Sequence, residues 1–391
     1  MKDPLEKPLK RLAEIQRKHA KLLAVFIIIF TIVLGIGLKD LTINSDIRKE
    51  LPLQLPIFKL NDRVNEKFGG KDTVIIAVKL DESVDLKSAA RDIRDTRVIQ
   101  SLIFLDEMLR EDISVASVTS PASFFRGREV TPEEITETLL SGKADAFFSR
   151  DYKTALMSIS ADIGSGEERL QSFNKRIEEH VEHTPKPPGV KFSITGQPAL
   201  RITIFDLLKR DAGVTLLAAS IIILILLFIM QRSYSQGLLI FVPLFLGLIW
   251  TMGALGWLGI PLAVSTVGLS SMILGLGVEY GVFVLSRYKE ERAKNQSQLD
   301  SMKTTVYGIG TAIIGSGLTT IVGFGVLSFS SVPMIQHLGQ TLALGIAFCL
   351  IAALFANPVL ILLEEDYEYR STKRNHEKLA AKKEAHDTRV W

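Results

Sequence analysis

The sequence predicts a polytopic α-helical membrane protein with six spans and one mixed α/β domain inserted after the first span. Apolar residues make up 47% of the 391 residues, but they gather in six stretches, five of them in the second half. Each stretch can cross about 30 Å of hydrocarbon as a helix of roughly 20 residues. We place the spans at residues 22–38, 212–230, 238–258, 261–285, 305–329 and 338–363.

Lys and Arg in the short flanks of the spans predict the orientation. The arm at residues 1–21 and the connection at 286–304 are rich in both residue types, whereas the turns after the third and fifth spans carry neither. This distribution favours a cell (cytoplasmic) membrane protein with both termini in the cytoplasm. We therefore expect an extracytoplasmic domain at residues 39–210, a five-helix bundle at 211–365 and a charged cytoplasmic tail at 366–391.

The inserted domain has the alternation of an α+β unit. A start signal for a further short helix, Thr131-Pro132-Glu133-Glu134, lies within residues 121–142. The order strand–helix–strand occurs twice, which predicts a split βαβ arrangement. The expected strands are residues 73–80, 115–120, 155–163 and 190–195, and the expected long helices are 97–111 and 166–183.

Several classes of function lack their residues here. The domain shows no His/Cys cluster, no phosphate loop and no Ser/His/Asp spacing, so we expect a binding or gating body, not an enzyme. The only cysteine, Cys349, lies in the last span, which leaves no disulfide framework and no cysteine-based metal site. The net charge is +3, and the basic residues mark the topology and contact lipid headgroups, so we expect no nucleic-acid partner. We also expect no metal and no cofactor.

Glu279 is the chemically informative residue, because it lies deep inside the fourth span. An ionisable group at the centre of a membrane helix costs roughly 2.5–3.5 kcal/mol on insertion scales and is usually functional. A carboxyl group escapes part of that cost by binding a proton. The residue therefore indicates a protein that handles protons; a protonated acid that only joins helices is the alternative.

Small and polar residues surround this position in the sequence. Ser271, Gly275 and Glu279 are four residues apart and share one helical face, while Gly277 and Gly281 form a small-residue pair on another. Such residues let a neighbouring helix approach closely.

The fifth span is rich in glycine, including Gly323, and carries hydroxyl groups. Together with Ser271 of the fourth span, the residues Ser316, Thr319 and Thr320 are candidates to support a proton relay at Glu279. The alternative is that these small residues only permit close helix packing.

The start of the second span carries an apolar stretch at the boundary with the inserted domain. Phe205 and Leu208 are candidates to line a lipid-facing cleft, with Asp206 or Asp211 at its polar rim. An ordinary helix that continues past the membrane surface is the alternative, because apolar residues at such junctions often only pack.

The motifs resemble the RND (resistance–nodulation–division) permease superfamily, in its MmpL and sterol-sensing branch. The fourth-span signature of that branch is a glycine-rich turn, Asp-Tyr, then Arg-Tyr-Arg-Glu-Glu. The matching segments here are Gly275-Leu276-Gly277-Val278-Glu279-Tyr280-Gly281, Arg287-Tyr288-Lys289-Glu290-Glu291, Leu51-Pro52 through Phe68-Gly69-Gly70, Thr195-Gly196-Gln197-Pro198, Thr319-Thr320 with Gly323-Phe324, and Pro358.

The resemblance implies a ferredoxin-like, porter-type inserted domain and a proton relay at Glu279 and Tyr280. Glu279 stands where the family has aspartate. Family transporters commonly hold two such halves in one polypeptide, so a half-size chain implies assembly, most simply a C2 homodimer. In it, Glu279 of one subunit could hydrogen-bond Tyr280 of the other.

The function that the resemblance implies is proton-motive-force-driven export or transport of lipids or other hydrophobic molecules. A second hypothesis is an accessory subunit of protein export of the SecD/SecF type; those proteins typically carry Asp-Ala-Asn where this chain has Glu279-Tyr280-Gly281. A third is a lipid-sensing scaffold that does not pump.

Overall fold

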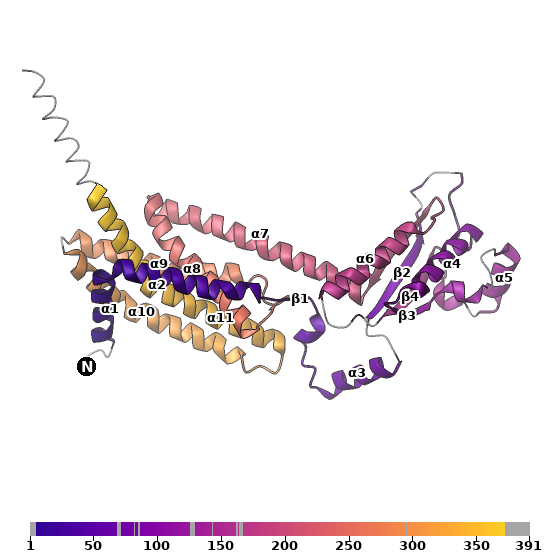
Figure 1. Cartoon of the computed structure of the whole chain (residues 1–391), viewed down its shortest axis with the longest axis horizontal. Helices are drawn as coiled ribbons and strands as arrows, with labels where there is room; N and C mark the ends of the chain where they lie inside the picture. Colours follow the sequence, from indigo (N-terminus) through magenta and orange to yellow (C-terminus); the bar gives the residue numbers. More distant parts are fainter. Residues whose placement is uncertain are drawn as a thin grey trace, which may run out of the picture. The chain divides into compact units, whose positions relative to one another are not determined.

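The computed structural model describes residues 5–68, 72–81, 83–84, 87–125, 130–142, 144–161, 163, 167–294 and 296–371. The chain divides into two compact units (Figure 1). The membrane unit comprises Met1–Pro52 and Leu208–Trp391, and the α/β unit comprises Leu53–Leu207. Gly69 and Gly70 of the family-like motif lie outside the described residues, as does most of the charged tail.

Among the described residues, six helices are long and apolar enough to cross a membrane, so the predicted multi-pass architecture is confirmed. The last of them continues from α11 through a π-helical turn, Ala352–Ala356, to Ser371. The helices are α2 (Ala20–Ile36), α7 (Gln197–Gln231), α8 (Tyr234–Leu258), α9 (Leu269–Ala293), α10 (Gln298–Leu327) and α11 (Pro333–Ile351).

The fourth span differs from the expected range at its start, because α9 begins at Leu269 and not at Pro261. The preceding residues form strand β6 (Leu262–Ala263), which pairs in parallel with β1 (Ile43–Asn44) after the first span. The Leu262 amide donates to the Thr42 carbonyl at 2.8 Å, so the segment uses its backbone groups in this ladder instead of in a helix.

Helix α9 lies at the centre of the membrane unit, where it packs against α8, α10 and α11. Helix α2 packs against α8, and its Thr31 hydroxyl accepts a hydrogen bond from Trp250 Nε1 at 2.9 Å. An amphipathic helix, α1 (Glu6–Lys18), packs against α10 at one end of the bundle and buries Leu9 and Ala13 (Figure 1).

The α/β unit contains a four-stranded antiparallel sheet with the order β3-β4-β2-β5. Helix α4 connects β2 to β3, and α6 connects β4 to β5, so β4 separates the two strands of the first strand–helix–strand segment. The elements are α3 (Pro56–Phe68), β2 (Asp72–Leu80), α4 (Thr96–Glu111), β3 (Val115–Thr119), α5 (Pro132–Leu140), β4 (Thr154–Ala161), α6 (Glu167–His183) and β5 (Val190–Gly196).

Alternating apolar residues of the sheet form the core of this unit against α4 and α6. Val74, Ile76 and Val78 of β2 are fully buried, together with Leu102 of α4 and Phe173 of α6. The alternation places one face of each strand under the helices, which is why the strand periodicity of the sequence predicted these elements.

Gly196 ends β5 at the point where α7 begins. Its φ of +107° lies in a region that favours glycine, and a Cβ there would lie 2.3 Å from the Thr73 carbonyl oxygen. The Thr195-Gly196-Gln197-Pro198 motif therefore forms a strand-to-helix turn that no other residue fits without a backbone shift.

Asp112, directly after α4, joins that helix to α6. Its carboxylate accepts hydrogen bonds from Arg176 Nε at 3.3 Å and His180 Nε2 at 3.2 Å, and the Ser114 amide donates to it at 2.8 Å. Burial of Asp112 opposes ionisation, but the hydrogen bonds from Ser114 and His180 and the charge of Arg176 hold its pKa below the ordinary value.

We predict that Asp112→Asn weakens local stability at pH 7 by about 1.5 kcal/mol, within the usual range for hydrogen bonds to a charged group. Because the folded-state pKa is depressed, this stabilisation is complete above the ordinary value of 3.8 and is lost as the pH falls below it. Hydrogen exchange of the peptide over α6, at pH 7 and near pH 3, measures the difference. Glu182→Gln, an exposed change on α6, is the control, and an equal effect of Asp112→Asn at both pH values would contradict the prediction.

Candidate functional site

Glu279 is the only Asp, Glu, Lys or Arg in the six apolar stretches. It lies on α9, and its side chain is exposed on the surface of the protomer. Among the described residues, none forms a hydrogen bond or ion pair with its carboxylate. The protomer by itself therefore presents an unpaired carboxyl group at the depth where a membrane would surround it, which is costly.

Tyr280, the next residue along α9, points into the interior of the membrane unit. Its side chain is only 3% exposed and belongs to the core of the membrane unit. A hydrogen bond from Tyr280 to Glu279 of another subunit would require the ring to leave that core. The two relay candidates face different surroundings in the single chain, and the reciprocal pair between subunits stays a prediction.

The glycines of α9 divide between these two sides. A Cβ at Gly277 would lie 2.8 Å from Cys349 Sγ of α11, and one at Gly281 would lie 2.9 Å from Ile240 Cγ2 of α8. Gly275, by contrast, has no neighbouring atom within 4 Å of such a Cβ. The inner face of α9 is thus packed to contact, whereas the face that carries Gly275 and Glu279 is open.

Helix α10 has a similarly open face. Gly308, Gly315 and Gly323 have open space where a Cβ would stand, so Gly323 is not a packing residue within the protomer. We call Gly275 and Glu279 of α9, together with Gly308, Gly315 and Gly323 of α10, the open face.

The hydroxyl groups expected near the acid bond to their own helices. Ser271 Oγ donates to the Gly268 carbonyl at 2.7 Å, and Thr319 and Thr320 donate to the Ser316 carbonyl at 2.8 and 3.0 Å. Backbone bonds of this kind are common for hydroxyls within helices. The structure therefore does not join these residues to Glu279, and their support of a relay stays a prediction.

The candidate cleft residues on α7 differ in exposure. Leu208 is buried, Phe205 is half-buried, and Asp206 and Asp211 are exposed. They lie where the two units divide, and a cleft there also stays a prediction.

Sequence reasoning missed a buried acid in the membrane unit. Glu50 is 3% exposed, its Oε1 lies 3.2 Å from His337 Nδ1 at the start of α11, and its Oε2 accepts from Ser265 Oγ at 3.4 Å. These residues join the segment after the first span to the loop before α9 and to the first turns of α11. No local pattern could reveal the contact, because the partners are more than 200 residues from Glu50 in the sequence.

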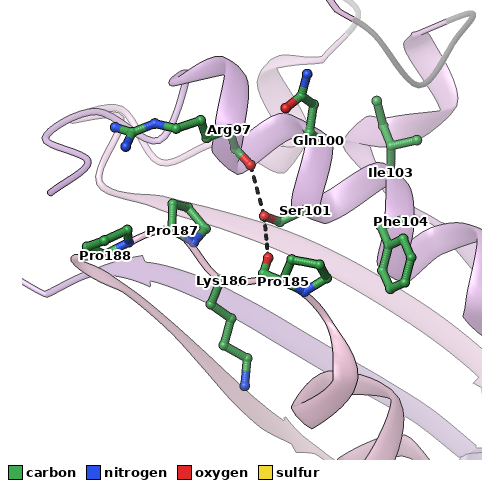
Figure 2. Close-up of a pocket in the computed structure, with 9 residues that line it drawn as sticks. All are labelled: Arg97, Gln100, Ser101, Ile103, Phe104, Pro185, Lys186, Pro187 and Pro188. Atoms are coloured by element: carbon green, nitrogen blue, oxygen red, sulfur yellow. Dashed lines mark hydrogen bonds between the residues drawn. The ribbon is translucent and has the colours of Figure 1, made fainter. Parts of the chain in front are cut away.

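A pocket of about 470 Å³ lies in the α/β unit between α4 and the proline segment before β5 (Figure 2). Arg97 and Lys186 supply its charges, but Arg97 already pairs with Asp95 at 2.7 Å and bonds the Ser88 carbonyl at 2.8 Å. The Ser101 hydroxyl donates a hydrogen bond to the Pro185 carbonyl at 2.7 Å. This lining offers no catalytic group, and the described residues contain no cluster of potential metal ligands.

A model of the MMPL family matches residues 52–391, which include the α/β unit, the five later spans and the Glu279 segment. The chain belongs to the MMPL family. A protein of Methanocaldococcus jannaschii, named as a membrane protein and designated MJ1562, is 34% identical over 95% of this chain and 97% of its own length. The predicted resemblance to RND permeases of the MmpL kind is thus confirmed.

Mycobacterial members of the family are also similar. The siderophore exporter MmpL5 of Mycobacterium tuberculosis is 28% identical over 54% of this chain, and a Mycobacterium leprae protein named as transport protein MmpL4 is 27% identical over 58%. The alignments cover 23% and 24% of those two proteins. The chain therefore matches about a quarter of the length of each of them.

We predict that Gly281→Ala destabilises the protomer, because the added Cβ would overpack the α8–α9 contact at a cost of about 1–3 kcal/mol. Gly275→Ala, the matched control on the same helix, should fold normally because its Cβ meets open space. Thermal unfolding in detergent at low protein concentration compares the two variants. Equal midpoints would show that the inner face of α9 is not packed as described.

Proposed function

We propose that this protein is a proton-driven RND-type transporter of lipids or other hydrophobic molecules that works as a homodimer in the cell membrane. The observation that carries the proposal is the lone carboxyl group of Glu279, which lies in an apolar span and has no partner among the described residues of its own chain. Such a group is retained in a membrane helix chiefly where it has a task.

The carboxyl group is suited to proton coupling. It can be neutral while it faces an apolar environment and charged when water reaches it. One charge that crosses 100 mV is worth about 2.3 kcal/mol, enough to shift a two-state equilibrium of helices α9 and α10 by more than tenfold. Tyr280, buried beside α11, would then respond to the position of α9.

The names of the relatives support transport as the outcome of this coupling. MmpL5 is named as a siderophore exporter and MmpL4 as a transport protein. Both align with the present chain over more than half of its length. A hydrophobic cargo is consistent with the absence of a catalytic constellation from the described part of the α/β unit.

A second copy of this chain is the occupant that we propose for the open face. Equivalent faces can meet across a two-fold axis, where bare glycines allow close helix approach. Contact between two such faces would remove both Glu279 carboxyls from lipid and place them near the axis. Protonation of one acid would then be felt by the other.

The α/β unit is proposed to be a ferredoxin-like, porter-type domain on the extracytoplasmic side. Its strand order, β3-β4-β2-β5, is the split βαβ order, and the basic flanks of the spans favour this orientation. Substrate would pass through this unit after it leaves the membrane.

We predict that Glu279→Gln abolishes proton-coupled transport, because Gln keeps the size of the side chain but cannot exchange a proton. Glu279→Asp should be partly active, since Asp keeps the carboxyl group on a side chain that is one methylene shorter. Proton uptake by vesicles that contain the reconstituted protein measures both. Wild-type uptake by the Gln variant, with equal protein incorporation, would exclude the relay.

We predict that cysteines placed at Gly275 of the open face, or at the exposed Leu276 beside it, form cross-links between subunits in a Cys349→Ala background. Leu274→Cys is the matched control, because Leu274 is fully buried on the inner side of the same helix. Cross-linking is read as dimer mass on a denaturing gel after oxidation in lipid. Cross-links from Leu274 alone, or monomers from every position, would contradict the proposed dimer face.

A further inference from the structure

The last membrane helix contains a widened turn whose cause can be read from the sequence. Pro358 has no backbone N–H, so the carbonyl of Leu354, four residues earlier, has no donor within the helix. The proline ring also crowds that carbonyl. The helix accommodates both effects with the π-helical turn Ala352–Ala356, and turns of this kind are frequent at functional sites.

The free carbonyl is satisfied from another helix. Gln16 of α1 donates its Nε2 to the Leu354 oxygen at 2.7 Å, and this glutamine is fully buried. A buried amide is costly unless it is hydrogen-bonded, so the bond accounts for a polar residue within the apolar stripe of α1. Gln16 thus ties α1 to the π-helical turn.

On its other side the turn bonds to the helix that carries the acid. Asn357, directly after the turn, is fully buried and donates its Nδ2 to the Gly281 carbonyl of α9 at 3.2 Å. Gly281 lies two residues after Glu279, and a Cβ there would approach Asn357 Nδ2 to 3.3 Å. The contact therefore depends on glycine at this position of α9.

Both amides keep one buried oxygen without a partner among the described residues: Gln16 Oε1 and Asn357 Oδ1. Each amide nitrogen donates one hydrogen bond, whereas neither amide oxygen accepts one from the described residues. Groups that are only partly satisfied form arrangements that a small helix shift can rebuild at little cost, unlike a fully bonded network.

We propose that Gln16, the π-helical turn and Asn357 form a joint that positions the Glu279 segment of α9. Asn357 is a positioning residue, because it acts on the acid through the backbone of Gly281. This inference rests on the proposed proton coupling. It adds that the docking of α1 and the position of the acid are coupled through one turn of the last helix.

The joint acts on Glu279 in a region with few other titratable groups. Within the apolar stretches of the elements packed against the turn, these are Tyr280 of α9, Tyr307 of α10 and Cys349 of α11. Outside those stretches the same elements carry Glu6, Lys7, Lys10, Arg11, Glu14, Arg17 and Lys18 on α1, Tyr234 on α8, Arg287, Tyr288, Lys289, Glu290, Glu291 and Arg292 on α9, Asp300 and Lys303 on α10, and His337 on α11. Glu279 is the one acid among them within an apolar stretch. A change in the pH dependence of transport on loss of the joint therefore reports on Glu279.

The test compares proton flux against pH for the full chain in vesicles. Asn357→Ala and Gln16→Ala should each move the pH of half-maximal flux, by about one unit, a common size for environmental effects on a protein carboxyl. The double variant should move it no further than the larger single change, because both substitutions open the same joint. Asn357→Leu, which keeps the volume, carries the test if the alanine variant fails to fold.

Thr341→Ala is the matched control, since Thr341 is a fully buried α11 residue whose hydroxyl has no partner among the described residues. The control should keep the wild-type midpoint. The inference is overturned if the Asn357 and Gln16 variants keep that midpoint, or if their shifts add. Glu279→Gln in the same assay separates the two ideas: flux that survives it removes the proposed function, whereas lost flux with unshifted Asn357 variants removes only the joint.

Discussion

The constraint on which the membrane unit depends is the cost of an ionisable carboxyl group in hydrocarbon. Glu279 can meet that cost by binding a proton, by pairing with a polar group or by contact with water. The protomer supplies no pairing partner among its described residues. The open face around Glu279 is therefore the unfinished part of the protomer, and the proposed dimer completes it.

The rest of the membrane unit holds α9 firmly on its other side. Gly277 and Gly281 bring its backbone into contact with α11 and α8, and Asn357 bonds it to the last helix. At its start, the β1–β6 ladder and the Glu50 contacts tie the loop before α9 to the segment that leads toward the α/β unit. A helix fixed on one side and at one end can transmit a shift of its acid as a displacement of the whole segment.

Local patterns in the sequence predicted most of the elements. The β-branched runs and helical stripes of the inserted domain became β2 to β5, α4 and α6, because burial of one face produces those periodicities. The apolar stretches became membrane helices because each is long and apolar enough to cross the hydrocarbon layer. The start of α9 was misplaced, because the apolar residues 261–268 suit a strand and turn as well as a helix.

The sequence could not predict which face of α9 packs, since Gly275 and Gly277 look alike until neighbouring helices are placed. The bond from Gln16 to Leu354 was also hidden, because its partners are 338 residues apart. Two signals were present: Pro358 implies a free carbonyl at Leu354, and a glutamine in an apolar stripe implies a buried partner.

An electron cryo-microscopy map of the full chain in a lipid bilayer tests the central claim most directly, because it shows what covers Glu279. The account predicts protein density from a second copy of α9 and α10 against Gly275 and Glu279, with the two acids close to a two-fold axis. Lipid acyl chains packed against Glu279 in a monomer would contradict it.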